Sequence, residues 1–306
     1  MILVFGSINL DLIFSLPALP REGETVLGPS YRVAPGGKGA NQALAAARDG
    51  AEAALIGRVG ADGFARMALE LLRGSTIELG AVAAGTLPTG CAAVCVDPGG
   101  RNLIAVASGA NREASADQVA DARLGRDTTL VMQMEVPVAE NGRLIERARR
   151  AGARIVLNLA PAQPLPEAAL AAVDVLIVNE GEGRMLCGAL GLAADVAAAG
   201  ARGLATRLGI AVAMTLGGEG AVAVSAGEAW RVGALPIEPI DTTGAGDAFV
   251  GVLASSLDRG LPLSKALHRA SVAGGLACLV PGAQPSLPTR QAIDEQLVRL
   301  PEPLAI

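Results

Sequence analysis

The stretch from Asp241 to Phe249, DTTGAGDAF, combines residue types that can hold a phosphate and take up a proton. Gly244 and Gly246 lie where an extended segment gives way to an apolar helical pattern, and glycine permits both a positive φ and close ligand approach. The first N–H groups of a helix lack intrahelical acceptors and lie in the positive field of its dipole, so they can bind an anion. Asp247 adds a carboxylate to this turn. The stretch predicts a phosphate site, although an Asp in a first turn also stabilises a helix without any catalytic role.

A second glycine loop, PGGKGAN, precedes an Ala-rich helical pattern and offers backbone amides together with Lys38 and Asn41. It is not a Walker loop, because Gly39 follows the lysine where that motif has Ser or Thr. The chain also contains no GxGxxG fingerprint, which removes the main support for a dinucleotide site. Three glycines around a lysine suit a small polyhydroxylated ligand better than a triphosphate. The alternative is a simple turn between a strand and a helix.

Short apolar runs alternate with helical patterns through much of the chain, which predicts an α/β fold with a mostly parallel sheet and helices on both faces. Strands are expected at residues 2–5, 53–56, 129–134, 155–157, 175–178 and 212–215. Polar residues recur just after these runs, and parallel strands bring such positions to one crevice. These residues are Asn9, Asp11, Glu135, Asn158, Asn179 and Glu182.

Two regions break this alternation and predict a small accessory sheet inserted into a single domain that spans residues 1–306. Extended, Pro-interrupted sequence covers about 12–33, and a hairpin covers about 88–108 around the turn at 97–100. Cys91 and Cys95 fall on one face of the first hairpin strand, where we expect ordinary small core residues. A hairpin at 221–232 and helices at 62–73, 138–151, 248–258, 263–279 and 290–299 complete the expected elements.

Composition narrows the possible functions. The 306 residues are 51% apolar but only 2% aromatic, and the net charge is −5 with no Lys/Arg run. Nucleic acid and membranes are therefore poor candidate partners, and no apolar run approaches the length of about 18 residues typical of a spanning helix. The N-terminus lacks a basic region and a cleavage site, so we expect a cytoplasmic protein.

Metal-ligating and nucleophilic residues are scarce. The four cysteines form no CxxC pair, and His268 is the only histidine and lies in an ordinary helical pattern. A zinc site and a Ser/His/Asp triad are therefore not expected. Catalysis would rest on carboxylates, a lysine, backbone amides and a bound metal.

Taken together, the motifs resemble the ribokinase branch of the PfkB-type carbohydrate kinases over nearly the whole chain. They occur in the order GSINLD, GETV, GGKGANQALAA, MQME, LNLAPA, VNEGE, TLGGEGA, DTTGAGDAF and GAQPS. DTTGAGDAF is highly specific for the superfamily, and GGKGANQA with GSINLD narrows the resemblance to ribokinase-like members. The resemblance implies a Rossmann-like sheet with a small β-sheet lid, which often serves as the clasp of a homodimer.

The same resemblance implies ATP-dependent phosphorylation of the 5-hydroxyl of D-ribose, giving ribose 5-phosphate and ADP. The alternatives are a kinase of the same fold acting on another sugar or a nucleoside, and a non-catalytic sugar-binding relative. Phe14 and Tyr31 are the few aromatic residues near the lid, which weighs against stacking a nucleoside base. Retention of Asp247 with both glycines of GAG weighs against a non-catalytic protein.

Matching the family motifs residue by residue implies roles for the candidate site. Asp247 resembles the general base, with Gly244, Ala245 and Gly246 supplying amides to the transferred phosphoryl group. The positions that match sugar contacts are Asn9, Asp11, Gly37, Lys38, Asn41 and Glu135. The positions that match the nucleotide site are Asn179, Thr215, Gly217, Gly220, Gly246 and Ser271.

Two metal sites are also implied by the resemblance. Glu182, with Asn179, matches the NxxE motif that organises Mg²⁺ and its waters near the phosphates. An activating monovalent cation such as K⁺ is implied by Asp241, Thr243, Gly282 and Ser286. The chain departs from the family at Val280-Pro281, where ribokinases often carry polar or basic residues. This change could reshape the cation loop, but backbone carbonyls do most of the binding there.

Overall fold

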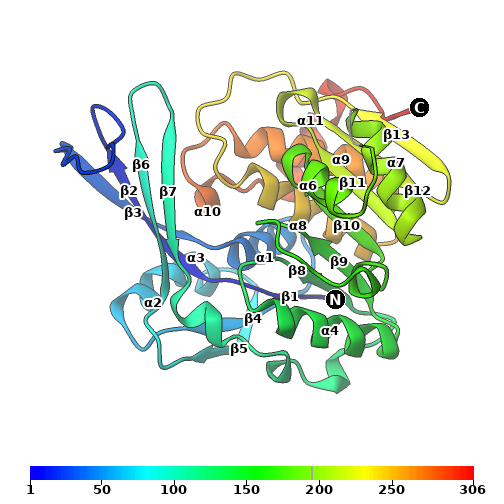
Figure 1. Ribbon diagram of the computed structural model, residues 1–306, viewed down its shortest axis with the longest axis horizontal. Coiled ribbons are helices and arrows are strands. Elements are labelled where there is room, and N and C mark those ends of the chain that lie inside the picture. Colours follow the sequence, from blue (N-terminus) through cyan, green and yellow to red (C-terminus); the bar gives the residue numbers. More distant parts are fainter. Residues whose placement is uncertain (194–195) are drawn as a thin grey trace.

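The computed structural model describes residues 1–193 and 196–306, and it contains a large sheet between helices with a smaller sheet beside it (Figure 1). In the large sheet the parallel strands run in the order β5 (Glu78–Ala84), β4 (Ala53–Val59), β1 (Ile2–Phe5), β8 (Thr129–Met132), β9 (Arg154–Asn158), β10 (Val175–Asn179) and β11 (Ala211–Thr215). Antiparallel strands β12 (Ala221–Ser225), β13 (Glu228–Val232) and β14 (Leu304–Ala305) extend its other end. The predicted mostly parallel α/β fold is confirmed.

Strand β1 is buried on both faces, which explains its continuous apolar sequence. Ile2 and Val4 belong to one core cluster, and Leu3 and Phe5 belong to a second cluster on the opposite face. The first cluster includes side chains of α1 (Lys38–Arg48), α8 (Ala245–Asp258) and α9 (Leu263–Ala277). The second includes side chains of α4 (Val138–Ala151), α6 (Glu180–Ala189) and α7 (Ala197–Leu208). No helix within the described ranges has the length and apolar composition needed to cross a membrane.

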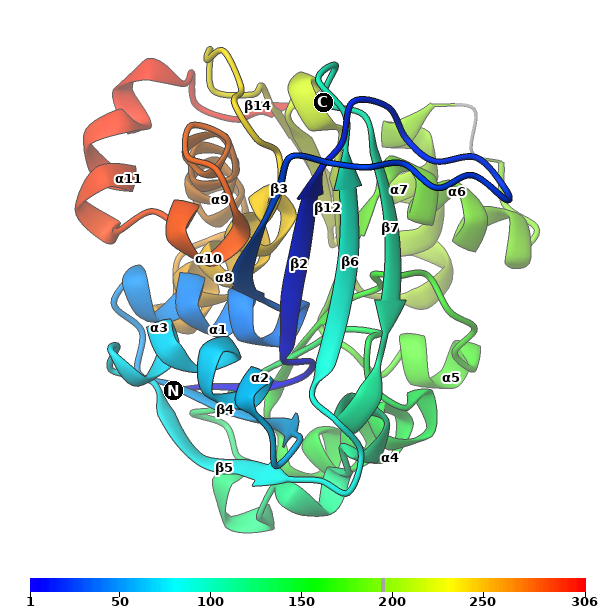
Figure 2. The ribbon, with the colours of Figure 1, turned by 90° about the vertical axis from the view of Figure 1, so that its left-hand side faces the viewer.

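The smaller sheet, here called the lid, stands at the left of the molecule in Figure 1 and faces the viewer in Figure 2. Its strands lie in the order β3 (Ser30–Gly36), β2 (Asn9–Ser15), β6 (Gly90–Val96) and β7 (Asn102–Ala107). The expectation that Asn9 and Asp11 end a strand of the main sheet is wrong. The chain leaves that sheet after Phe5, and both residues lie in β2, paired with Gly36 and Ala34 of β3.

Other expected elements differ in detail. The helix expected at 62–73 is split into α2 (Gly63–Ala68) and α3 (Glu70–Arg73), and Asp62 caps the first. Strand β5 was not anticipated, because its Ala-rich sequence has little β-propensity and it pairs only with β4 at the sheet edge. Cys91 and Cys95 are half-buried free thiols and not core residues, since the lid is a single layer.

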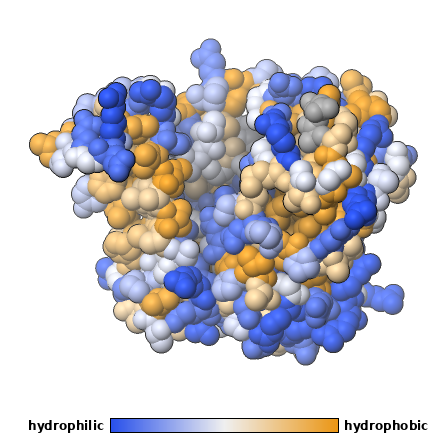
Figure 3. Space-filling view, viewed as in Figure 1, coloured by the Kyte–Doolittle hydropathy of each residue, from blue (hydrophilic) through white to orange (hydrophobic). Residues whose placement is uncertain are grey.

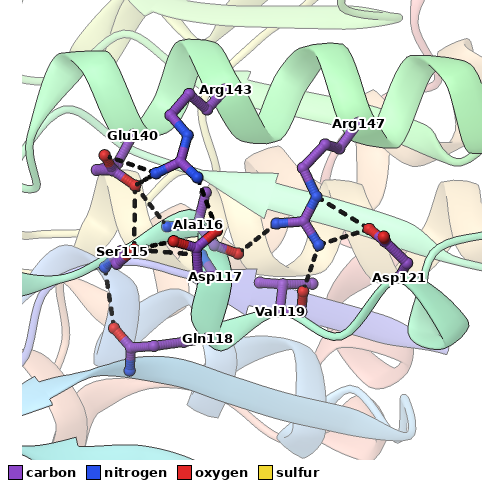
Figure 4. Close-up of polar contacts among 9 residues, drawn as sticks. All are labelled: Ser115, Ala116, Asp117, Gln118, Val119, Asp121, Glu140, Arg143 and Arg147. Atoms are coloured by element: carbon purple, nitrogen blue, oxygen red, sulfur yellow. Dashed lines mark hydrogen bonds and ion pairs between the residues drawn. The ribbon is translucent and has the colours of Figure 1, made fainter.

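After the lid, the chain returns to the main sheet through three 3-10 turns at 109–113, 116–118 and 121–123. Figure 4 shows how two arginines of α4 hold this return segment. The guanidinium of Arg147 donates to the carbonyl oxygens of Ala116 and Val119, each at 2.6 Å. Arg143 forms an ion pair with Asp117 at 2.7 Å. The segment between lid and sheet is thereby fixed to a helix of the core.

The C-terminus of α1 contacts residues from the C-terminal part of the chain. Asp49 is fully buried and forms ion pairs with Arg269 of α9 at 2.7 Å and with Arg259 at 3.0 Å. Its neighbour Arg48 donates to the carbonyl oxygens of Gln284 and Leu287, beside α10 (Ala283–Ser286). These contacts fix one end of the helix whose other end carries Lys38 and Asn41.

We expect Asp49→Asn to lower the free energy of unfolding by about 3 kcal/mol, because Arg259, Arg269 and Arg290 would lose a buried counter-charge. Denaturant unfolding would measure the loss. Asp117→Asn is the matched control, since its carboxylate is 71% exposed in its pair with Arg143 and should contribute less than about 1 kcal/mol. Equal losses in the two variants would contradict a special role for the buried pair.

Candidate active site

Three neighbouring cavities follow the carboxyl edge of the main sheet. The lid cleft, of about 580 Å³, lies between the lid and the body and is the hollow visible in Figure 3. The central cavity, of about 240 Å³, shares Lys38, Gly244 and Asp247 with it. The apolar pocket, of about 260 Å³, shares Thr215 and Gly246 with the central cavity. The three therefore form a continuous path, with Asp247 where the first two meet.

The structure brings most of the predicted site residues to this path. Those lining the lid cleft are Asn9, Asp11, Gly37, Lys38, Asn41, Glu135, Asp241, Thr243, Gly244 and Asp247. Those lining the central cavity and the apolar pocket are Asn179, Glu182, Thr215, Gly217, Gly220, Ala245, Gly246 and Ser271. Gly282 and Ser286 line none of the three, and lie at and within the short helix α10.

The first turn of α8 offers backbone donors to the path. Gly244 precedes the helix with φ 80°, a left-handed conformation that favours glycine. The N–H groups of Gly244, Gly246 and Asp247 donate to no acceptor in the part of the chain that the structure describes. The N–H of Ala245 instead donates to the carbonyl oxygen of Thr242 at 3.3 Å. Three amides are therefore available to an anion, with Asp247 replacing Ala245 in the set expected from the sequence.

The carboxylate of Asp247 is 8% exposed and is held by two side-chain amides of α1. Asn41 donates to Oδ2 at 2.8 Å, and Gln42 donates to Oδ1 at 2.9 Å. Asn41 was expected to contact a ligand, and Gln42 was not singled out at all. The only sequence signal for Gln42 is that it directly follows Asn41, the last residue of the second glycine loop. Helical spacing cannot reveal a contact with a residue as distant in the sequence as Asp247.

Lys38 lies among acidic side chains. Burial disfavours its charge, but Asp247, Glu135 and Glu182 outweigh burial, and the pKa of the ammonium is raised. Its backbone N–H donates to Glu135 at 3.2 Å, so the glutamate is held beside the lysine. The cleft therefore keeps a fixed positive charge next to Asp247.

Asp11 projects from the lid strand into the same cluster. Burial, followed by the negative charges of Glu135 and Asp247, raises the pKa of Asp11 to about 6. Arg32 and Lys38 act in the opposite direction. The cleft thus holds several hydrogen-bond acceptors together with a few donors, a pattern suited to a ligand with many hydroxyl groups.

Asn179 and Glu182 form a capping box at the start of α6. The side chain of Asn179 accepts from the N–H of Glu182, and Glu182 Oε2 accepts from the N–H of Asn179, both at 2.8 Å. Burial raises the pKa of Glu182 against the hydrogen bond from Asn179 and the charge of Lys38. The pair therefore has a structural role, and Glu182 Oε1 has no partner among the described residues.

The apolar pocket suits a flat aromatic group. Its walls include Leu235, Ile237 and Phe249, none of which the sequence indicated as site residues. Ser271 is 8% exposed and is a polar side chain of this pocket. The pocket is joined to the free amides of α8 through Gly246, so a ligand could place an apolar ring here and phosphates there.

Asp241 organises the loop beside the lid cleft. Its oxygens accept from the N–H groups of Thr243 at 2.9 Å and Gly282 at 2.8 Å, and Arg32 of the lid lies 3.7 Å away. Burial alone would raise the pKa of Asp241, but these hydrogen bonds and the arginine lower it. The hydroxyl of Ser286 donates to the carbonyl oxygen of Ala283. The structure thus brings Asp241, Thr243 and Gly282 together, with Ser286 inside the adjoining helix.

Comparisons with known proteins identify the family of the chain. The family model described as pfkB family carbohydrate kinase matches residues 1–290. The ribokinase of Haemophilus influenzae is 34% identical over 299 residues, which cover 94% of this chain and 95% of that protein.

Solved structures give the same result for the fold. The ribokinase of Thermotoga maritima superposes with a TM-score of 0.89 at 29% identity, covering 97% of this chain and 99% of its own. The ribokinase of Arabidopsis thaliana, solved with ribose and ATP, superposes with a TM-score of 0.86 at 29% identity, covering 97% and 98%. Because the family model and these relatives span nearly the whole chain, the resemblance indicated by the motifs is confirmed. The chain belongs to the pfkB family of carbohydrate kinases.

Proposed function

We propose that this kinase transfers the γ-phosphoryl group of ATP to the 5-hydroxyl of D-ribose, giving ribose 5-phosphate and ADP. The observation that carries the proposal is the position of Asp247 between the lid cleft and the free amides of α8. The Arabidopsis relative, which was solved with ribose and ATP, supports this pair of substrates. Ribose would occupy the lid cleft, and ATP the central cavity and the apolar pocket.

The polar residues of the lid cleft favour a small sugar. Carboxylates of Asp11 and Glu135 can accept hydrogen bonds from hydroxyl groups, and Lys38 can donate. No aromatic side chain of the described residues lines the cleft, and Phe14 and Tyr31 pack against each other with ring centroids 5.9 Å apart. A nucleoside base would therefore lack a stacking surface. Another sugar with the same hydroxyl pattern remains the second candidate.

Asp247 is the proposed general base. Asn41 and Gln42 each donate to one carboxylate oxygen, and each oxygen keeps a further lone pair for the proton of the sugar hydroxyl. The amides of Gly244, Gly246 and Asp247 would stabilise negative charge on the transferred phosphoryl group. In phosphoryl transfer most of the catalysis comes from such positioning and electrostatics.

Two ions complete the proposal. Mg²⁺ bound to the phosphates of ATP would neutralise their charge, and Asn179 and Glu182 would hold its waters, with Glu182 Oε1 free to accept. Asp241, Thr243, Gly282 and Ser286 are the proposed surroundings of a monovalent cation such as K⁺. The lowered pKa of Asp241 keeps a negative charge there that suits a cation.

A homodimer formed through the lid is also part of the proposal, in a cytoplasmic protein. On the face of the lid that does not line the cleft, the edge strand β7 exposes Leu103, and β3 exposes Tyr31 and Val33. Covering these apolar side chains with a second copy would remove exposed apolar surface and unpaired strand edges.

An assay of ADP release over ribose, 2-deoxyribose, fructose, ketopentoses and adenosine, with and without K⁺, tests the proposed function. We expect the highest kcat/KM for ribose and a lower rate when Na⁺ replaces K⁺. A clear preference for adenosine or for a ketose would overturn the choice of acceptor. An absence of sugar-dependent ADP release would overturn the activity itself.

We expect Asp247→Asn to leave sugar binding nearly unchanged and to lower kcat by about 10²–10⁴, the usual contribution of a positioned base. Calorimetry without ATP would measure binding, and coupled ADP release would measure kcat. Asp258→Asn makes the same change at the other end of α8, outside the three cavities, and should keep kcat within about twofold. Near-normal turnover in Asp247→Asn would rule out its role as the base.

We expect Asp11→Asn to be more stable than the unchanged protein at pH 7.5, by about 2 kcal/mol, when no ligand is present. The pKa of Asp11 is raised from 3.8 to about 6, so the fold favours its protonated form. The stability due to this form is fully present below about pH 4 and lost as pH rises through about 6. Denaturant unfolding of both proteins at pH 4, 6 and 7.5 should show a difference that grows with pH. A difference in the free energy of unfolding that stays constant from pH 4 to pH 7.5 would contradict the raised pKa of Asp11.

A further inference from the structure

The return segment after the lid carries a buried amide that the proposed chemistry does not use. Asn111 lies in the first 3-10 turn after β7 and is 1% exposed. The turn is fixed beneath the lid because the N–H of Ala110 donates to the carbonyl oxygen of Pro88 at 2.7 Å. The side chain of Asn111 reaches back to the start of β2, where it meets Ile8 and Asn9.

One backbone group determines how this amide must be oriented. The N–H of Ile8 donates to Asn111 Oδ1 at 2.9 Å. A backbone N–H can only donate, so the atom facing it must be the side-chain oxygen of Asn111. Nδ2 of Asn111 is then directed to the carbonyl oxygen of Ile8 at 3.3 Å and to Asn9 Oδ1 at 2.7 Å.

The orientation of Asn9 follows from that of Asn111. Since Asn111 presents a donor, Asn9 must turn its oxygen toward it, and its own Nδ2 is left on the other side of the amide. Asn9 is 4% exposed and lines the lid cleft, and its Nδ2 has no acceptor among the described residues. A chain of two amides thus leaves Asn9 with a free donor on the side away from Asn111, and Asn9 is a residue that lines the lid cleft.

Gly90 leaves the room that this arrangement needs. It is paired with Asn9 across β2 and β6, and a Cβ at this position would overlap with Asn9 Oδ1 and Asn111 Nδ2. Asn9, Gly90 and Asn111 come from three separate segments of the chain, and the three residues pack closely against one another.

We infer that Asn111 is a positioning residue for the acceptor sugar: it makes Asn9 present its amide donor, and not its carbonyl oxygen, to a hydroxyl oxygen of the sugar. Asp11 and Glu135 line the same cleft and can only accept while they are ionised. A donor at Asn9 complements them, because a hydroxyl can then accept from the amide while it donates to a carboxylate. The inference rests on the proposed function, in which the sugar occupies the lid cleft.

Asn111→Asp tests this inference. The carboxylate still accepts from Ile8, but it cannot donate to Asn9, so Asn9 would turn its NH₂ group inward and present an oxygen to the cleft. We expect the Kd and KM for ribose to rise about tenfold, which is the effect expected when a hydrogen-bond donor to the sugar is replaced by an acceptor. The KM for ATP should stay within about twofold. Calorimetry with ribose in the absence of ATP measures binding independently of turnover.

A double-mutant cycle separates positioning from a general loss of structure. If Asn111 acts through Asn9, then adding Asn111→Asp to the Asn9→Ala variant should cause no further loss of ribose affinity. Asn141→Asp is the matched control, because Asn141 is a fully buried amide whose NH₂ donates to Gln133 and which lines none of the three cavities. It should lower the melting temperature without changing the Kd for ribose.

Asn9→Asp gives a second test that does not disturb Asn111. The new carboxylate still accepts from Asn111, so the fold is retained, but the donor to the cleft is lost and the Kd for ribose should rise at least about tenfold. Unchanged ribose affinity in Asn9→Asp, or additive losses in the cycle, would overturn the inference. Ribose-dependent ADP release by the unchanged protein reports on the proposed function separately, so the two failures are distinguishable.

Discussion

The close packing of α1 against α8 is the contact on which the site depends. Gly251 of α8 faces α1, and a Cβ there would come within 2.5 Å of Ala45 and 2.6 Å of the carbonyl oxygen of Gln42. Asp247 lies one turn before Gly251, on the same side of the helix, so this approach brings its carboxylate within reach of Asn41 and Gln42. One backbone contact between two helices thus places the two glycine loops, which are some 200 residues apart in the sequence, around a single carboxylate.

The charges around that carboxylate form a second constraint. Asp11, Glu135, Glu182 and Asp247 all act on Lys38, and they come from four different elements or loops. Their mutual repulsion is tolerated because the lysine is charged and because backbone N–H groups hold Glu135 and Glu182. A ligand that brings hydroxyl groups and a cation would relieve this repulsion, so the charges of the site favour such a ligand.

Much of the fold could be predicted from local pattern. Apolar runs bounded by glycine or polar residues indicated the parallel strands, and α4 begins and ends where its pattern predicts. Failures occurred where local sequence carries little information. Strand β5 is an Ala-rich edge strand, and Asn9 lies in the lid because Gly6 to Ile8 lead the chain out of the main sheet. No local pattern distinguishes these outcomes from a loop or a strand end.

The sequence alone determined the chemistry of the site: DTTGAGDAF already implied free amides beside a carboxylate, since a glycine-led helix start has unpaired N–H groups whatever surrounds it. The tertiary structure decided which groups orient that chemistry. Gln42 reaches Asp247, Asn111 reaches Asn9, and the N–H of Ala245 is occupied by Thr242. The first two contacts join residues more than 100 positions apart, and such pairings follow from how helices and strands pack and not from any local propensity.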